Sequence, residues 1–346
     1  MPAKTDESGG SREGYVRMRD VNRTPGTSTS GTTQPRSAGA ARLAVLVPGG
    51  RGQLGSEISR ILGGRADALV HAPGSAEFDI TDGHFVAGAV GSFAESARSA
   101  GCRPVVLNAA AHTDVDGAES DSRTAGRINA EGPSALAAAC EASDAPLVHV
   151  STDYVFPGDG AEPYEPDDVV DPRTVYGRTK LDGERAVLDS GARAWVVRTS
   201  WVYGGFGANF VKTVARLESQ RALLSVVDDQ VGGPTWAGDL AGGLLELAGR
   251  VVRGDGPARS VLHCANSGSV SWHGFARAVF TELGANPERV QACTSAEFPR
   301  PAPRPAYSVL SGRAWREAGL SPPRPWREAL SAAFASDGDR FRAPPS

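Results

Sequence analysis

A glycine-rich turn stands between an apolar run and an amphipathic stretch, and it constrains the fold more than any other feature. Residues 43–47 (Leu-Ala-Val-Leu-Val) form a continuous apolar run, which is typical of a buried parallel strand. Over residues 53–62, apolar side chains recur at i, i+4, i+7 and i+8, the spacing of one helical face. A strand, a tight turn and a helix in this order indicate a chain built from βα units.

The glycines of this turn match a phosphate-binding pattern. Gly49, Gly52 and Gly55 fit G-x-x-G-x-x-G, and G-x-G-x-x-G also fits through Gly50. Such a turn lets the backbone approach a pyrophosphate, whose charge faces the N-terminus of the following helix. Because 42 of the 346 residues are glycine, the placement between strand and helix carries more weight than the pattern. The alternative is an ordinary βα turn.

Strand and helix patterns alternate further along the chain. Apolar runs predict buried strands at 104–107, 146–150 and 194–198, with an Ala-rich helical region ending near Ser143 and a helix at 174–188. Beyond Gly204 the alternation weakens, and helices are predicted at 206–218, 239–248, 272–283 and 325–334. The pattern indicates an α/β protein with a doubly wound parallel sheet and a smaller α+β lobe.

Composition excludes several classes of partner. The chain has 36 Lys+Arg against 40 Asp+Glu, a net charge of −4, so neither nucleic-acid binding nor a polybasic membrane anchor is expected. The sequence contains no apolar run of about 18 residues that would predict a membrane span. The four cysteines (Cys102, Cys140, Cys264 and Cys293) form no C-x-x-C pair, which predicts a reduced, cytoplasmic protein and no metal site.

Tyr176 and Lys180 form a Y-x-x-x-K pattern at the start of the helix predicted at 174–188. At this spacing the two side chains share a helical face, with Cβ atoms about 5–6 Å apart. A nearby cation lowers the pKa of a tyrosine, which suits it to general acid catalysis. Ser151 and Thr152 follow the preceding strand, at the edge of the sheet where ligands bind. A surface pair and a turn-capping hydroxyl are the alternatives.

Arg51 bears on the choice of cofactor. The acidic residue that binds the adenine ribose of NAD is expected about 20 residues beyond the turn. Ala72-Pro73-Gly74-Ser75 stand there instead, and Glu77 and Asp79 follow. Arg51, inside the turn, could meet a 2′-phosphate, which favours NADPH and leaves NADH open. An exposed arginine without a partner is the alternative.

These residues resemble the dTDP-4-dehydrorhamnose reductases of the extended short-chain dehydrogenase/reductase superfamily. The similarity extends in blocks from Leu43 to about Phe334. The most specific blocks are S-T-D-Y-V-F-P-G at 151–158, R-T-S-W-V-Y at 198–203 and D-Q-V-G-G-P-T at 229–235. The other blocks are 49–55, 78–82, 108–116, 175–181 and 304–310. Pro48 and the pair Arg173-Thr174, at the expected edge of the substrate pocket, depart from the family's pattern.

The resemblance implies a role for each matching residue. Tyr176 would donate a proton, Lys180 would bind the nicotinamide ribose and tune the tyrosine, and Thr152 would orient a 4-keto oxygen. The implied substrate contacts are Val115, Thr152, Asp153, Tyr176 and Trp201, although a tryptophan after a strand more often packs in a core or interface. The implied cofactor site comprises Gly49, Arg51, Gly52, Gln53, Leu54, Gly55, Asp79, Ile80, Ala109, Ala110, Ala111, Tyr176 and Lys180.

The resemblance also implies a Rossmann-type domain organisation. The expected parts are a disordered tail at 1–41, an NAD(P)-binding Rossmann domain at 42–203, a mainly substrate-binding lobe at 204–335 whose segments return to the sheet, and a tail at 336–346. The tail at 1–41 has no family counterpart and lacks the apolar content to fold.

The implied reaction is NAD(P)H-dependent reduction of the 4-keto group of dTDP-4-dehydro-β-L-rhamnose to dTDP-L-rhamnose, in nucleotide-sugar biosynthesis. A sugar-nucleotide epimerase or dehydratase on the same fold is one alternative, although Asp153-Tyr154 stand where a dehydratase would carry an Asp-Glu pair. A non-catalytic NADP-binding regulatory subunit is another, and the intact Tyr/Lys pair counts against it. The residues do not decide between a monomer and a homodimer.

Overall fold

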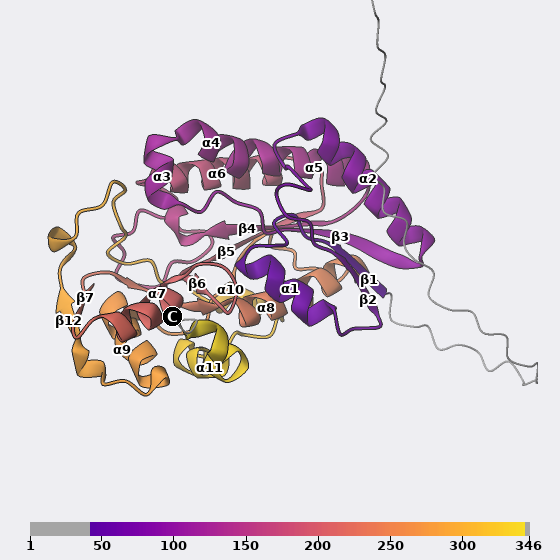
Figure 1. The fold of residues 1–346 in the computed structure, drawn as a ribbon. Helices are drawn as coiled ribbons and strands as arrows, with labels where there is room; N and C mark the ends of the chain where they lie inside the picture. Colours follow the sequence, from indigo (N-terminus) through magenta and orange to yellow (C-terminus); the bar gives the residue numbers. More distant parts are fainter. Residues whose placement is uncertain (1–41, 343–346) are drawn as a thin grey trace, which may run out of the picture. The chain divides into compact units, whose positions relative to one another are not determined.

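A six-stranded parallel sheet forms the centre of the fold (Figure 1). The computed structural model describes residues 42–342, so the predicted tail at 1–41 lies outside the described residues. The strand order is β2-β1-β3-β4-β5-β10, and every neighbouring pair is parallel. The strands are β1 (Arg42–Leu46), β2 (Ala68–His71), β3 (Cys102–Asn108), β4 (Leu147–Thr152), β5 (Ala194–Thr199) and β10 (Val261–His263).

The strand order confirms the predicted doubly wound sheet. β1 pairs with β2 on one side and with β3 on the other, so the chain crosses over β1 after completing β2. This crossover creates a topological switch point between β1 and β3, where ligands of open α/β sheets bind at the carboxyl ends of the strands. The glycine-rich turn follows β1 at this edge.

Helices cover both faces of the sheet (Figure 1). One face carries α2 (Gly83–Ser99), α5 (Gly132–Ala142) and α6 (Val175–Leu188), and the other carries α1 (Gln53–Leu62) and α8 (Ala237–Arg253). Between β3 and α5 lie α3 (Val115–Ser120), α4 (Ser122–Gly126) and η1 (Arg127–Glu131). The middles of the strands are mainly apolar because both faces of the sheet are buried: Val105 and Leu107 join the cluster beneath α1 and α8, whereas Val106 joins the cluster beneath α2 and α5.

A separate apolar cluster, which includes Phe275, Phe280 and Leu330, forms the core of the smaller lobe. Its helices are α7 (Phe210–Gln220), α9 (Trp272–Leu283) and α11 (Trp326–Phe341). Short strands pair there as β7 (Leu224–Val227) with β12 (Val290–Cys293), β8 (Val231–Gly232) with β11 (Val270–Ser271), and β6 (Val202–Tyr203) with β9 (Thr235–Trp236). The remaining elements are η2 (Asp153–Val155), η3 (Pro287–Arg289), η4 (Ser295–Glu297) and α10 (Arg313–Glu317).

The chain beyond residue 204 is not confined to this lobe. α8 packs on α1, and β10 pairs with β5 in the central sheet. The tail predicted from residue 336 is wrong over its first part, because α11 continues to Phe341, whose ring is 1% exposed and stacks on Phe334. Asp337, where the backbone angles depart from helical values, is also buried, so this segment packs on the protein although its polar composition resembles a tail. No helix in the described range is long and apolar enough to cross a membrane.

Candidate active site

The glycine-rich turn is shaped by close backbone packing. Gly49 has φ +80°, and a β-carbon there would lie 2.6 Å from the Ala110 nitrogen. A β-carbon at Gly55 would lie 2.5 Å from Cα of Gly50, so only glycine lets the helix approach the turn. Gly52 precedes α1, and no side chain caps this helix. The N–H groups of its first turn are therefore available to an anion.

The end of β3 lies against this turn. The Ala109 N–H donates to the carbonyl of Pro48 at 3.0 Å, and the Ala110 N–H donates to Oδ1 of Asn108 at 3.0 Å. Pro48 differs from the family's pattern and supplies no N–H, but its carbonyl still accepts this hydrogen bond from Ala109. The structure thus brings the Ala109–Ala111 segment, implied in the cofactor path, next to the glycines.

Arg51 is paired with a carboxylate. Its guanidinium forms an ion pair with Glu77, and its side chain is 73% exposed. The Gly74 N–H also donates to Glu77 at 3.0 Å. This backbone hydrogen bond, followed by the one from Arg51, holds the pKa of Glu77 below its usual value. Arg51 lies at the mouth of the turn, so an incoming phosphate would have to compete with Glu77 for it.

Other implied cofactor residues have local structural roles. Leu54 and Ile80 are 8% and 4% exposed and lie in two different apolar clusters, so they offer a cofactor mainly their backbone. Gln53 accepts a hydrogen bond from Nδ2 of Asn209 at 3.1 Å. Oδ1 of Asp79 accepts from the N–H and hydroxyl of Thr81 at 2.9 and 2.8 Å.

Tyr176 lies in the first turn of α6, which Thr174 caps by accepting the Gly177 N–H at 2.9 Å. Burial raises the pKa of the Tyr176 phenol to about 12, and hydrogen bonding with Thr152 opposes the rise. The ring of Tyr154 packs edge-on against it, with centroids 5.5 Å apart, and Val115 belongs to the same cluster. The phenol is therefore protonated at neutral pH.

Lys180 is 1% exposed, one helical turn beyond Tyr176. Its Nζ donates to the carbonyl of Val150 at 2.8 Å and lies 3.4 Å from Nε2 of His149. Burial lowers the pKa of Lys180 to about 8, while the charge of Glu184 acts to raise it. Both the amine and the ammonium are accessible near neutral pH.

Thr152 ends β4 and faces this pair. Its hydroxyl donates to Oδ1 of Asp153 at 3.0 Å and accepts the Tyr154 N–H at 3.2 Å. Asp153 is 3% exposed, and burial raises its pKa to about 6. Its Oδ2 has no partner among the described residues. Asp153 therefore orients the Thr152 hydroxyl, and the nearby Ser308 hydroxyl acts to lower the pKa of Asp153.

Trp201 follows β5 with φ +46°, a left-handed conformation that is strained for a bulky side chain. Its indole stacks on Trp272 at 3.5 Å with an interplanar angle of 5°. A β-carbon at Gly232 would lie 2.5 Å from Cζ2 of Trp201, so this glycine admits the ring. The indole face on Trp272 is closed to a ligand, and a substrate contact would use the rest of the ring.

A cavity of about 270 Å³ opens beside Tyr154. Its lining residues are Tyr154, Phe156, Pro157, Gly158, Arg173, Thr174, Pro303, Arg304, Pro305 and Ala306. Arg173 and Thr174, the pair that departs from the family's pattern, therefore do lie at the edge of a pocket. Tyr154 lines the cavity and also packs on Tyr176, so the ring of Tyr154 connects the cavity wall to the Tyr/Lys pair.

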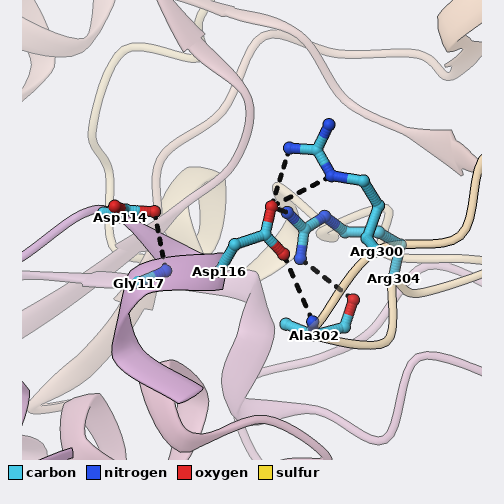
Figure 2. A network of polar contacts seen from close by, with 6 residues as sticks. All are labelled: Asp114, Asp116, Gly117, Arg300, Ala302 and Arg304. Atoms are coloured by element: carbon cyan, nitrogen blue, oxygen red, sulfur yellow. Dashed lines mark hydrogen bonds and ion pairs between the residues drawn. The ribbon is translucent and has the colours of Figure 1, made fainter. Parts of the chain in front are cut away.

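Asp116 contacts Arg304, one of the residues that line this cavity (Figure 2). Its carboxylate accepts hydrogen bonds from Arg300 at 2.7 and 3.0 Å, from Arg304 at 2.8 Å and from the Ala302 N–H at 3.2 Å. Burial acts to raise the pKa of Asp116, but these donors together outweigh it and hold the pKa below its usual value. The sequence assigned no role to Asp116 or Arg304, which lie 188 residues apart in the chain. The only indication in the sequence was that Asp116 and Arg304 lie in blocks that resemble the reductase family, 108–116 and 304–310.

The class of protein is the NAD(P)-binding short-chain dehydrogenase/reductase fold. It is defined by the glycine-rich turn at the switch point, the buried Tyr176/Lys180 pair and Thr152 at the end of β4. The chain belongs to the family of the RmlD substrate binding domain, whose model matches residues 43–338.

Its relatives include a dTDP-4-dehydrorhamnose reductase of Mycobacterium tuberculosis H37Rv, 50% identical over 297 residues, with 84% of this chain and 92% of the relative covered. The dTDP-4-dehydrorhamnose reductase of Streptomyces griseus is 47% identical over 294 residues, covering 84% of this chain and 92% of that protein. Among solved structures, the dTDP-4-dehydrorhamnose reductase of Bacillus anthracis in complex with NADP superposes with a TM-score of 0.78. It is 33% identical, and the match covers 85% of this chain and 99% of that one.

Proposed function

We propose that this chain reduces the 4-keto group of dTDP-4-dehydro-β-L-rhamnose to the alcohol of dTDP-L-rhamnose, with NADPH as the reductant. The observation that carries this proposal is the buried Tyr176/Lys180 pair with Thr152 beside it, at the sheet edge that the glycine turn also occupies. The names of the relatives, and the NADP in the Bacillus anthracis structure, support it. We also propose that the protein works in the cytoplasm, where nucleotide sugars are made.

The residues of the turn fit a dinucleotide. Only glycine fits at positions 49 and 55 of the glycine-rich turn. The uncapped N-terminus of α1 offers its N–H groups to a pyrophosphate. Arg51 would contribute a positive charge at the edge of the glycine-rich turn. When bound, NADPH supplies the hydride.

The proton comes from the chain. Tyr176 holds its phenolic proton at neutral pH and would donate it to the oxygen that forms at C4. The ammonium of Lys180 would stabilise the negative charge that develops there, and so would the hydroxyl of Thr152 once its proton turns from Asp153 to the substrate oxygen. Tyr154 follows Asp153 where a dehydratase would carry a second carboxylate.

The direct test is NADPH oxidation, followed by absorbance, with the 4-keto-rhamnose nucleotide generated in situ. We expect oxidation to depend on the nucleotide sugar and the product to be dTDP-L-rhamnose by chromatography against a standard. The 5-epimeric 4-keto nucleotide is the specificity control, and we expect slower turnover with it. The absence of oxidation above background would refute the proposal.

Replacing Arg51 with alanine should weaken NADPH binding about tenfold and leave NADH binding unchanged, because only NADPH carries a 2′-phosphate for the guanidinium to bind. Glu77→Gln should tighten NADPH binding, since it removes the anion that competes for Arg51. Fluorescence titration with both cofactors measures each effect. Arg65→Ala, which removes an exposed arginine paired with Asp67, is the matched control. Equal weakening of both cofactors would instead assign Arg51 to the shared pyrophosphate.

Replacing Asp116 with asparagine should raise the KM for the nucleotide sugar several-fold to about tenfold and leave kcat nearly unchanged, because Arg304 loses the charge that holds it at the cavity. Steady-state kinetics separates the two constants. Asp114→Asn is the matched control in the same helix: Asp114 caps α3 by accepting the Gly117 N–H at 2.9 Å, and asparagine caps equally well (Figure 2). An equal effect of both substitutions would show that the charge on Asp116 has no special role.

A further inference from the structure

His149 is a fully buried side chain, 0% exposed, that none of the steps above uses. It lies in β4, between Asn108 of β3 and Lys180 of α6. Its Nδ1 is 3.0 Å from Nδ2 of Asn108, and its Nε2 is 3.4 Å from Nζ of Lys180. The imidazole thus bridges the sheet edge near the glycine turn and the Tyr/Lys pair.

The backbone determines which way the Asn108 amide faces. The Ala110 N–H donates to its Oδ1 at 3.0 Å, and only an oxygen can accept this bond. The amide NH₂ therefore faces His149, and an NH₂ group can only donate. Nδ1 of His149 must accept, so it carries no proton.

The proton of His149 is consequently on Nε2. Burial, followed by the charge of Lys180, holds the pKa of His149 well below its usual value, so the ring is neutral and carries a single proton. That N–H faces Nζ of Lys180. An amine at Nζ can accept it while donating to the Val150 carbonyl at 2.8 Å, whereas an ammonium has no lone pair to offer.

We propose that His149 is a positioning residue for Lys180: Asn108 holds its imidazole in the Nε2–H tautomer, and this N–H favours the amine form of Lys180. His149 thereby sets the pH above which the site loses its cation. The inference rests on the proposed function only for the role it gives to Lys180.

Other charged and titratable groups also act on this pair. Glu184 lies one turn further along α6 and is ion-paired with Arg198 of β5. Tyr176 shares the helix, Asp153 of η2 acts on Tyr176, and Glu119 of α3 accepts the Val175 N–H at 2.8 Å. The charge of Glu184 favours the ammonium form of Lys180, whereas burial and the His149 N–H favour the amine form.

The first test is the ¹⁵N NMR spectrum of the ring nitrogens in the full-length chain, without cofactor or substrate. The chemical shift of each nitrogen reports whether it carries a proton, and the resonances that His149→Gln removes identify His149. We expect the proton on Nε2. A proton on Nδ1 would overturn the proposal, and this result would stand whether or not the protein is a reductase.

The second test reverses the tautomer. Asn108→Asp keeps an acceptor for the Ala110 N–H and presents a second carboxylate oxygen to Nδ1, so the proton should move to Nδ1 and leave a lone pair facing Lys180. An ammonium is then favoured, and the alkaline limb of kcat/KM should shift upward by about one pH unit. Asn286→Asp, which adds the same charge at the exposed cap of η3, is the matched control and should leave this limb in place.

Two results of this second test would overturn the proposal. An unchanged tautomer in Asn108→Asp would show that residue 108 does not direct the imidazole. A reversed tautomer with an unmoved alkaline limb would show that His149 does not act on Lys180. Neither result would bear on whether the parent protein oxidises NADPH.

Discussion

Tyr176→Phe should lower kcat for reduction of the 4-keto nucleotide by about 10²–10⁴-fold, because the variant lacks the phenolic proton that a general acid must deliver. The ring remains, so its packing against Tyr154 and Val115 should persist. Binding of NADPH, measured by fluorescence titration, should change little. The loss would therefore appear in kcat and in single-turnover rates.

A second buried tyrosine provides the control for this experiment. Tyr203 is 1% exposed and belongs to the core of the other lobe, where its hydroxyl has no partner among the described residues. Tyr203→Phe removes the same atom from a comparably buried ring, and we expect parental kcat. If Tyr176→Phe turned over as fast as the parent, the proton would have another source and the proposed mechanism would be wrong.

Glu184→Gln should lower the free energy of unfolding by about 3–5 kcal/mol, because it leaves the buried guanidinium of Arg198 without its counter-charge. The two side chains are 1% and 5% exposed and form a bidentate pair, with N–O distances of 2.7 and 2.9 Å. The guanidinium also donates to the Pro166 carbonyl at 3.1 Å and lies 5.0 Å from the ring centre of Phe156. Urea denaturation followed by circular dichroism would measure the change.

The matched control is Glu288→Gln, which breaks an exposed pair with Arg277. The side chains of that pair are 72% and 33% exposed, so solvent screens the charges and we expect a far smaller loss of stability than for Glu184→Gln. Replacing both Glu184 and Arg198 by methionine should recover much of the stability, since neither charge of the pair is then left without its partner. A cost for Glu184→Gln as small as that of the control would show that Arg198 finds compensation elsewhere.

Elements with strong local periodicity were predictable from the sequence. The helix at 53–62 and the helix at 272–283 have the predicted bounds as α1 and α9. Neither β2 nor α2 is predicted. β2 is four residues long and only partly buried at the edge of the sheet, and α2 is rich in glycine and alanine, which blurs its apolar face. Such elements are held by their neighbours more than by their own pattern.

Some residues of the candidate site were likewise predictable from the sequence, and others were not. The placement of Gly49, Gly55 and the Tyr176/Lys180 pair was predictable because it depends on the local backbone and on one helical turn; their roles stay predictions. The role of Asp116 was not. Trp201 was selected through the family resemblance, but its stacking on Trp272 depends on the second lobe and no pattern in the sequence indicates it.

The sequence by itself determined the βα turn that can receive a pyrophosphate, the alternation that makes a parallel sheet, and the Tyr/Lys spacing on one helix. Each of these follows from periodicity and backbone sterics over a few neighbouring residues. Only the tertiary structure decided that Asp116 holds Arg304, 188 residues away, and that His149 stands between Asn108 and Lys180. Those contacts depend on strand order and on helix packing across the sheet, and no short stretch of sequence encodes either.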